Sequence, residues 1–116
     1  MAPNPTADIF RDILHERARQ EHLQAKGRFK YTCADPRMAV GDKALALGEE
    51  FGEVCQAVLE EADLSYDKHP TMSVRKELVQ IAAVAVAWIE SIDKAANQPW
   101  EDLVADGGLP ESQEPD

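Results

Sequence analysis

Residues 77–90 read ELVQIAAVAVAWIE, a nearly uninterrupted apolar segment. Between Leu78 and Ile89 only Gln80 is strongly polar, so a helix over about residues 73–95 is expected to be apolar on every side. A helix of this kind lies in the middle of a bundle. A chain of 116 residues has too few elements to surround it completely. We therefore expect an all-α fold whose bundle is completed by homo-oligomerisation, as a homodimer or a homotetramer.

Residues 47–61, LGEEFGEVCQAVLEE, predict another helix over about residues 42–62. On a helical wheel one apolar stripe lies opposite most of the glutamates. The stripe contains Leu47, Phe51, Val54 and Val58, and Leu45 and Leu59 widen it. Gly48 and Gly52, four residues apart on the flank, would let another backbone approach closely. This helix is therefore expected to touch more than one neighbour.

The first helix is expected over about residues 7–25, with Thr6 as its cap. Gly27 breaks the helical pattern, and residues 26–36 are interpreted as a loop because they show no clear period. The dipeptide Asp35-Pro36 is one start signal for the next helix, and the later Gly41-Asp42 is a second one.

The chain is expected to form one domain. Residues 63–71 are rich in turn-forming side chains and are expected to connect two helices, and residues 99–103 can add a short helical turn. The expected organisation is a flexible N-terminus over residues 1–5, a helical domain over 6–104 and an acidic disordered tail over 105–116.

The overall charge excludes several partners. Twelve lysines and arginines stand against 22 aspartates and glutamates, which gives a formal charge of -10. This charge opposes attraction to a nucleic-acid polymer or to an anionic membrane, and no apolar run reaches the ~20 residues that span a bilayer. Cys33 and Cys55 lack the paired spacing of a zinc site, so reduced thiols in a cytoplasmic protein are expected.

Two pairs of helical positions can supply metal ligands. Glu50 and Glu53 are three residues apart with Glu49 beside them, and Glu77 and Gln80 repeat this spacing on the next helix. If the two helices pack antiparallel, three carboxylates and one amide converge in an oxygen-rich cage that suits magnesium. The alternative is an ordinary solvated acidic face, with Gln80 hydrogen-bonded inside the bundle.

The same residues resemble the EExxE and ExxD signature of MazG-like all-α NTP pyrophosphohydrolases, over roughly residues 40–95. The resemblance implies a MazG-like helical bundle that uses Mg²⁺, for which Mn²⁺ can substitute, to hydrolyse an NTP or dNTP to the monophosphate and pyrophosphate. The metal-ligand positions of the signature correspond in this sequence to Glu50, Glu53, Glu77 and Gln80. Its additional acidic position corresponds to Glu49. Gln80 departs from the signature, which has aspartate there.

Other residues are candidates for catalysis or substrate binding. Glu49 or Glu53 could orient or deprotonate the attacking water. Phosphate contacts are expected from bases near the acidic clusters in sequence, and the loop with its aromatic and basic side chains could close over a nucleotide. These substrate-binding candidates are Lys43, Arg75, Lys76, Lys30 and Tyr31. Surface salt bridges and a solvated loop are the plainer explanations.

Two functions are consistent with these patterns. The first is a magnesium-dependent nucleoside triphosphate pyrophosphohydrolase. The second is a catalytically weakened helical dimer that serves as a nucleotide-binding or protein-interaction module, an alternative that Gln80 keeps open.

Overall fold

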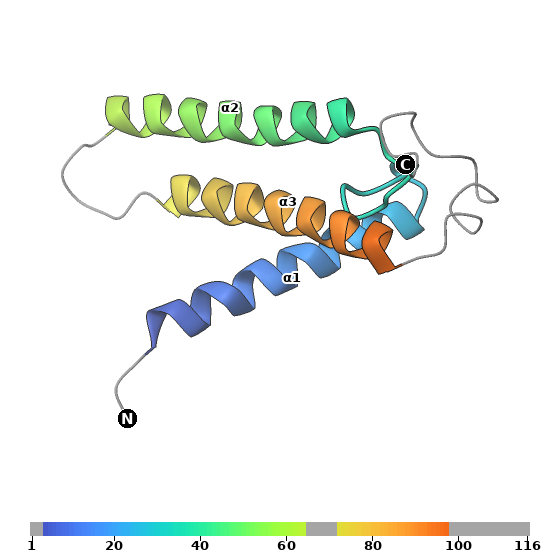
Figure 1. Ribbon diagram of the computed structural model, residues 1–116. Helices are drawn as coiled ribbons and strands as arrows, with labels where there is room; N and C mark the ends of the chain where they lie inside the picture. Colours follow the sequence, from blue (N-terminus) through green and yellow to red (C-terminus); the bar gives the residue numbers. More distant parts are fainter. Residues whose placement is uncertain (1–3, 65–71, 98–116) are drawn as a thin grey trace.

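The part of the chain that the structure describes contains three helices and no strand. The computed structural model describes residues 4–64 and 72–97. The helices are α1 (Pro5–Ala25), α2 (Val40–Leu64) and α3 (Met72–Asn97), each within about two residues of its expected bounds. Helices α2 and α3 run antiparallel side by side, and α1 crosses obliquely against α3 (Figure 1). The expected all-α fold is confirmed.

Helix α1 begins at a different cap from the expected one. The side chain of Asn4, instead of Thr6, accepts a hydrogen bond from the backbone N–H of Ala7 at 3.1 Å. Pro5 follows directly, and its fixed φ suits the first helical position. Thr6 therefore lies inside the first turn. The other end of the helix stops at Ala25, and Gly27 has a φ of +83°, which only glycine adopts without strain.

The segment between α1 and α2 folds as turns. The Asp35 carboxylate accepts a hydrogen bond from the backbone N–H of Arg37 at 2.9 Å, and the N–H of Met38 donates to the carbonyl of Asp35 at 3.1 Å. Asp35 and Pro36 thus form a turn and do not start a helix. Helix α2 begins at Val40, next to the second of the two start signals.

A small core joins this segment to the helices. Its buried residues are Cys33, Ala34, Val84 and Ala87, with Met38, Ala46 and Leu47 packed against them. Small side chains on α3 allow the turn segment and α2 to approach closely. One polar pair lies within the same contact, because the Lys43 amine donates to the Ser91 hydroxyl at 2.8 Å.

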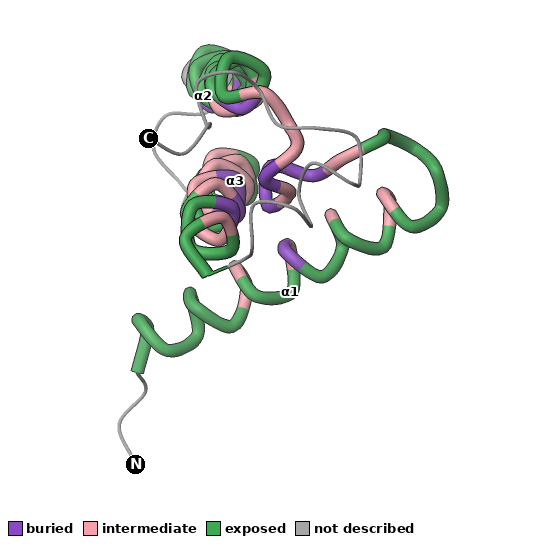
Figure 2. The backbone as a smooth tube through the Cα atoms, turned by 45° about the vertical axis from the view of Figure 1, so that its right-hand side comes forward, coloured by how far each residue is buried: buried purple, intermediate pink, exposed green. Residues whose placement is uncertain are grey.

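Helix α3 is central within the chain, since it contacts both α1 and α2. It is not covered on every side, however: Leu78, Ile89 and Ile92 are exposed. The stripe expected to be the core face of α2 is also only partly covered. Val54 is buried, whereas Phe51 is 59% exposed and Val58 49% exposed. Figure 2 shows this open outer side of α2.

The open side of α2 includes both of its flanking glycines. A Cβ atom placed on Gly48 or Gly52 would meet nothing within 4 Å. The close approach of another backbone that this spacing predicts therefore does not occur among residues 4–64 and 72–97. Leu45 and Leu59 lie exposed on the same side of the helix.

Two polar contacts fix how the helices meet. Arg17 on α1 is buried and binds both carboxylate oxygens of Glu90 on α3, at 3.2 and 2.8 Å. At the end of α2, one carboxylate oxygen of Glu61 accepts from the backbone N–H of Ser73 at 3.2 Å and also from its hydroxyl. Glu61 thereby caps the beginning of α3.

Several expectations lie outside the described residues: most of the 63–71 connection, the helical turn over 99–103, the tail over 105–116 and most of the N-terminus over 1–5. Among the helices that the structure describes, none combines the length and apolarity needed to cross a membrane.

Candidate metal centre

Three glutamates from α2 and α3 converge on one another. Glu50 and Glu53 come from α2 and Glu77 from α3, and each offers a carboxylate oxygen within 4.8 Å of the other two. The antiparallel packing produces this convergence, because the first turns of α3 lie beside the middle of α2. We call these three residues the acidic cluster. They are the three carboxylates that the sequence spacing brings together.

The cluster is electrostatically strained. Burial, together with the charges of Glu53 and Glu77, raises the pKa of Glu50 to about 7. Burial also raises the pKa of Glu77, and a hydrogen bond with Glu53 acts in the same direction. One oxygen of Glu50 and one of Glu77 are buried without a hydrogen-bond partner among the described residues. Such oxygens are costly unless a proton or a cation compensates them.

The donor set fits a hard divalent cation. All three groups are carboxylates, and oxygen ligands are what such cations prefer. Their mutual repulsion would become attraction to a shared positive charge, and the two unpartnered oxygens are available to it. The acidic cluster is therefore a candidate metal centre.

A fourth carboxylate was missed by the sequence analysis. Glu16 on α1 has a side chain only 12% exposed, and its charge raises the pKa of both Glu50 and Glu77. Arg19 binds both of its oxygens, at 2.9 and 2.8 Å. Its position in the sequence could have marked Glu16 as a candidate site residue. It continues the helical stripe of Ile9 and Ile13, where an apolar residue is expected.

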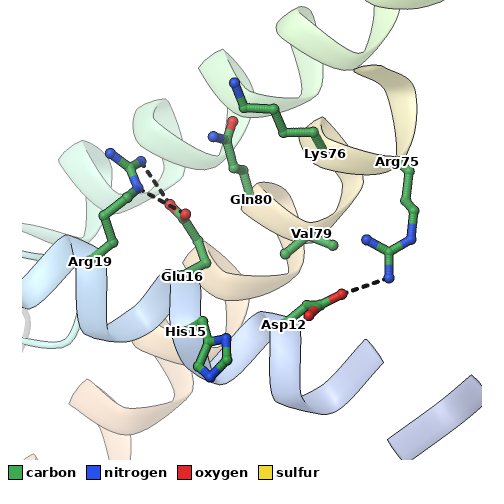
Figure 3. A pocket seen from close by; sticks show the side chains of 8 residues that line it. All are labelled: Asp12, His15, Glu16, Arg19, Arg75, Lys76, Val79 and Gln80. Carbon is green, nitrogen blue, oxygen red and sulfur yellow. Dashed lines mark hydrogen bonds and ion pairs between the residues drawn. The ribbon is translucent and has the colours of Figure 1, made fainter. Parts of the chain in front are cut away.

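A cavity lies between α1 and α3, and Lys76, the residue before Glu77, is part of its lining. It has a volume of about 530 Å³ and is lined by Asp12, His15, Glu16, Arg19, Arg75, Lys76, Val79 and Gln80. We call it the cationic cavity, because its three basic side chains outnumber its two carboxylates. Figure 3 shows Lys76 and Gln80 extending to the same side of α3, while Arg75 turns to Asp12.

A second cavity is enclosed by α1, the turn segment and α2. It measures about 490 Å³ and contains Leu23, Phe29, Tyr31 and Met38 among its lining residues, so we call it the aromatic cavity. Glu49 and Glu50 also line it, and it shares Glu16 and Arg19 with the cationic cavity. The acidic cluster thus reaches the aromatic cavity through Glu50, and Lys76, which precedes Glu77 in the sequence, lines the cationic cavity.

The expected site residues outside the cluster are distributed as follows. Glu49 and Tyr31 line the aromatic cavity, and Arg75, Lys76 and Gln80 line the cationic cavity. Lys30 is exposed, with its amine 5.2 Å from the centroid of the Tyr31 ring. Whether Gln80 binds metal stays a prediction.

Lys43 has a different role from the expected one. It is 1% exposed and hydrogen-bonded to Ser91, so its amine does not face either cavity. Its neighbourhood is apolar enough that burial lowers the pKa of the amine. The structure makes Lys43 a buried link between α2 and α3, a position that disfavours the expected contact with substrate.

Comparison with known proteins identifies no family. No protein-family model matches the chain, and neither the curated proteins nor the solved structures contain a significant match. The site is therefore defined by its own geometry: a three-carboxylate centre between two helices, one cavity that Glu50 lines, and a second cavity that shares Glu16 and Arg19 with the first.

Proposed function

We propose that the protein is a magnesium-dependent nucleoside triphosphate pyrophosphohydrolase. The observation that carries the proposal is the convergence of Glu50, Glu53 and Glu77, with two buried carboxylate oxygens that lack a partner in the described part of the chain. The resemblance of their spacing to the EExxE and ExxD signature supports the same function. The nearby basic side chains suit a phosphate-containing substrate.

The acidic cluster would hold Mg²⁺, with Mn²⁺ as a substitute, and the ion would supply neutralisation of the phosphate charge. Glu49 is exposed, lines the aromatic cavity and lies beside the cluster without belonging to it. Its carboxylate is therefore free to accept the proton of the attacking water. Glu53 is the poorer base, because a carboxylate that holds a cation binds protons weakly.

We further propose that two or four copies of the chain associate through the open side of α2. Leu45, Phe51, Val58 and Leu59 are each at least 49% exposed there. Gly48 and Gly52 lie between them with open space above, so a helix of a second copy could approach closely. Exposed apolar groups on α3, including Ile89 and Ile92, would extend the contact.

Pyrophosphate release from a panel of canonical and modified dNTPs, with Mg²⁺, Mn²⁺ or EDTA, tests the activity. We expect metal-dependent turnover of at least one substrate, loss of turnover in Glu50→Gln, and normal turnover in Glu60→Gln, an exposed glutamate of the same helix. Absence of turnover with every substrate and metal would contradict the proposal. Retained nucleotide binding in that case would favour the binding module.

A further inference from the structure

The two cavities differ in charge although they share Glu16 and Arg19 as lining residues. The cationic cavity has three basic side chains and two carboxylates, in a chain whose formal charge is -10. The aromatic cavity is lined by four carboxylates, those of Glu16, Asp42, Glu49 and Glu50, and its one described basic residue, Arg19, is bound to Glu16, so this cavity disfavours an anionic group. A ligand with one strongly anionic end and one flat apolar end would match this difference.

Lys76 is the cation best placed to meet an anionic ligand. In the cationic cavity Arg75 is bound to Asp12 at 2.7 Å, and Arg19 is bound to Glu16 at 2.8 Å. Lys76 forms no ion pair or hydrogen bond with any described residue. Lys76 directly precedes Glu77 in α3, and Figure 3 shows its side chain extending to the same side of the helix as Gln80.

The aromatic cavity offers a surface for a flat ring. Phe29 is 40% exposed, and Leu23 and Met38 line the same space. The Tyr31 ring is approached by Arg37, whose guanidinium carbon lies 5.0 Å from its centroid. Stacking on an exposed aromatic ring is a contact that every nucleobase can make.

We propose that a nucleoside triphosphate binds at the acidic cluster in a single orientation. Its base and sugar lie in the aromatic cavity, and its two terminal phosphates lie in the cationic cavity. This inference rests on the proposed function and adds an orientation to it. Water bonds to the α-phosphorus and gives its proton to Glu49. The bond from that phosphorus to the bridging oxygen breaks, and pyrophosphate leaves with this oxygen, in contact with Lys76.

The orientation is tested by measuring the affinity for each product by calorimetry in the presence of Mg²⁺. One product is pyrophosphate. The other is a nucleoside monophosphate, for which dAMP, dGMP, dCMP and dTMP are compared. Lys76→Gln is expected to weaken pyrophosphate binding about tenfold. Its affinity for the monophosphate that binds most tightly should stay within about twofold of that of the unmodified protein. Lys76→Arg should restore pyrophosphate binding. Phe29→Ala should show the opposite pattern, with the monophosphate weakened about tenfold.

Lys94→Gln is the matched control, because Lys94 is an exposed lysine at the other end of α3. It should bind both products like the unmodified protein. Lys76 and Phe29 are both exposed, so their variants should keep the helical circular dichroism.

Three results would overturn the orientation: unchanged pyrophosphate binding in Lys76→Gln, equal weakening of both products in either variant, or binding of neither product by the unmodified protein. Failure of the proposed function is seen separately, as absence of metal-dependent turnover by the unmodified protein. If the unmodified protein turns over substrate but the Lys76→Gln and Phe29→Ala variants do not show opposite changes in product binding, the proposed function stands and the proposed orientation is wrong.

Discussion

Glu50 and Glu77 belong to different helices, yet they place carboxylate oxygens within 4.8 Å of each other, and each also has a buried oxygen without a partner among the described residues. Two like charges at this separation disfavour the ionised form of both groups. The fold therefore maintains an arrangement that is unfavourable for the empty protein and favourable for a bound cation.

Replacing Glu50 should separate stability from function. Glu50→Gln removes one repelling charge, so at pH 8 and without metal it should raise the free energy of unfolding by about 1 kcal/mol. The same variant should lose metal binding and turnover. Urea unfolding with EDTA and calorimetric Mg²⁺ titration measure the two effects. A variant that is much less stable than the unmodified protein would show that Glu50 has a structural role instead.

The pH should act on metal binding through Glu50. Its pKa is raised from 4.5 to about 7, so the carboxyl is mostly protonated at pH 6 and mostly ionised at pH 8. A proton competes with a cation for this group, and Mg²⁺ affinity should rise about tenfold between these pH values. Calorimetry at pH 6, 7 and 8 measures the change. A pH-independent affinity would contradict a role for Glu50 as a ligand.

The metal-free protein should respond to pH in the opposite sense. A carboxyl whose pKa is higher in the folded than in the unfolded state binds more protons when folded, so the folded state is favoured at low pH. This contribution is lost as the pH rises from about 4.5 through about 7. Thermal unfolding with EDTA should give a lower Tm at pH 8 than at pH 6. In Glu50→Gln this difference should become smaller.

Lys43 should matter for stability and not for substrate binding. Ser91→Ala removes the only described hydrogen-bond partner of a buried amine and should cost about 1–3 kcal/mol in the free energy of unfolding. The KM of the folded fraction should not change. Urea unfolding and steady-state kinetics provide the two measurements, with Lys94→Ala as an exposed-lysine control. An increase in KM without loss of stability would return Lys43 to the substrate site.

The open side of α2 should govern assembly. Leu59→Lys places a charge on a residue that is 68% exposed in the single chain, so it should leave the fold intact and convert the oligomer to monomer. Light scattering after size-exclusion chromatography measures the mass, and circular dichroism checks the fold. Glu60→Lys is the matched control on the same helix. A monomeric unmodified protein would refute the proposed oligomer.

The three helices and the acidic cluster could be predicted because helical periodicity is local. Glu50 and Glu53 must share a side of α2, and an antiparallel α3 brings its first turn to them. Periodicity marks Glu16 as an acidic residue on an apolar stripe of α1, but it does not show that Glu16 lies near the acidic cluster. Its contribution depends on how α1 crosses α3, and the crossing is fixed by the Arg17–Glu90 pair, whose residues are far apart in the sequence.

The face of α2 that contacts α3 was predicted only in part. The apolar stripe suggested Phe51 and Val58, but the covered side is turned toward Lys43, Glu50 and Val54, which recur at helical spacing. Each polar member of this side has a specific role: Lys43 binds Ser91, and Glu50 joins the cluster. Burial of a polar side chain in exchange for such a contact is a tertiary effect that hydrophobic periodicity does not report.

The cap that Glu61 provides for Ser73 has a consequence for how the chain tolerates change. This contact sets the starting point of α3 against α2 through side-chain and backbone atoms, only one turn before Glu77. The alignment of the acidic cluster is therefore held independently of the peptide link that joins the two helices. Insertions between residues 65 and 71 should preserve the register of the carboxylates, which makes this position suited to an affinity tag or a fused domain.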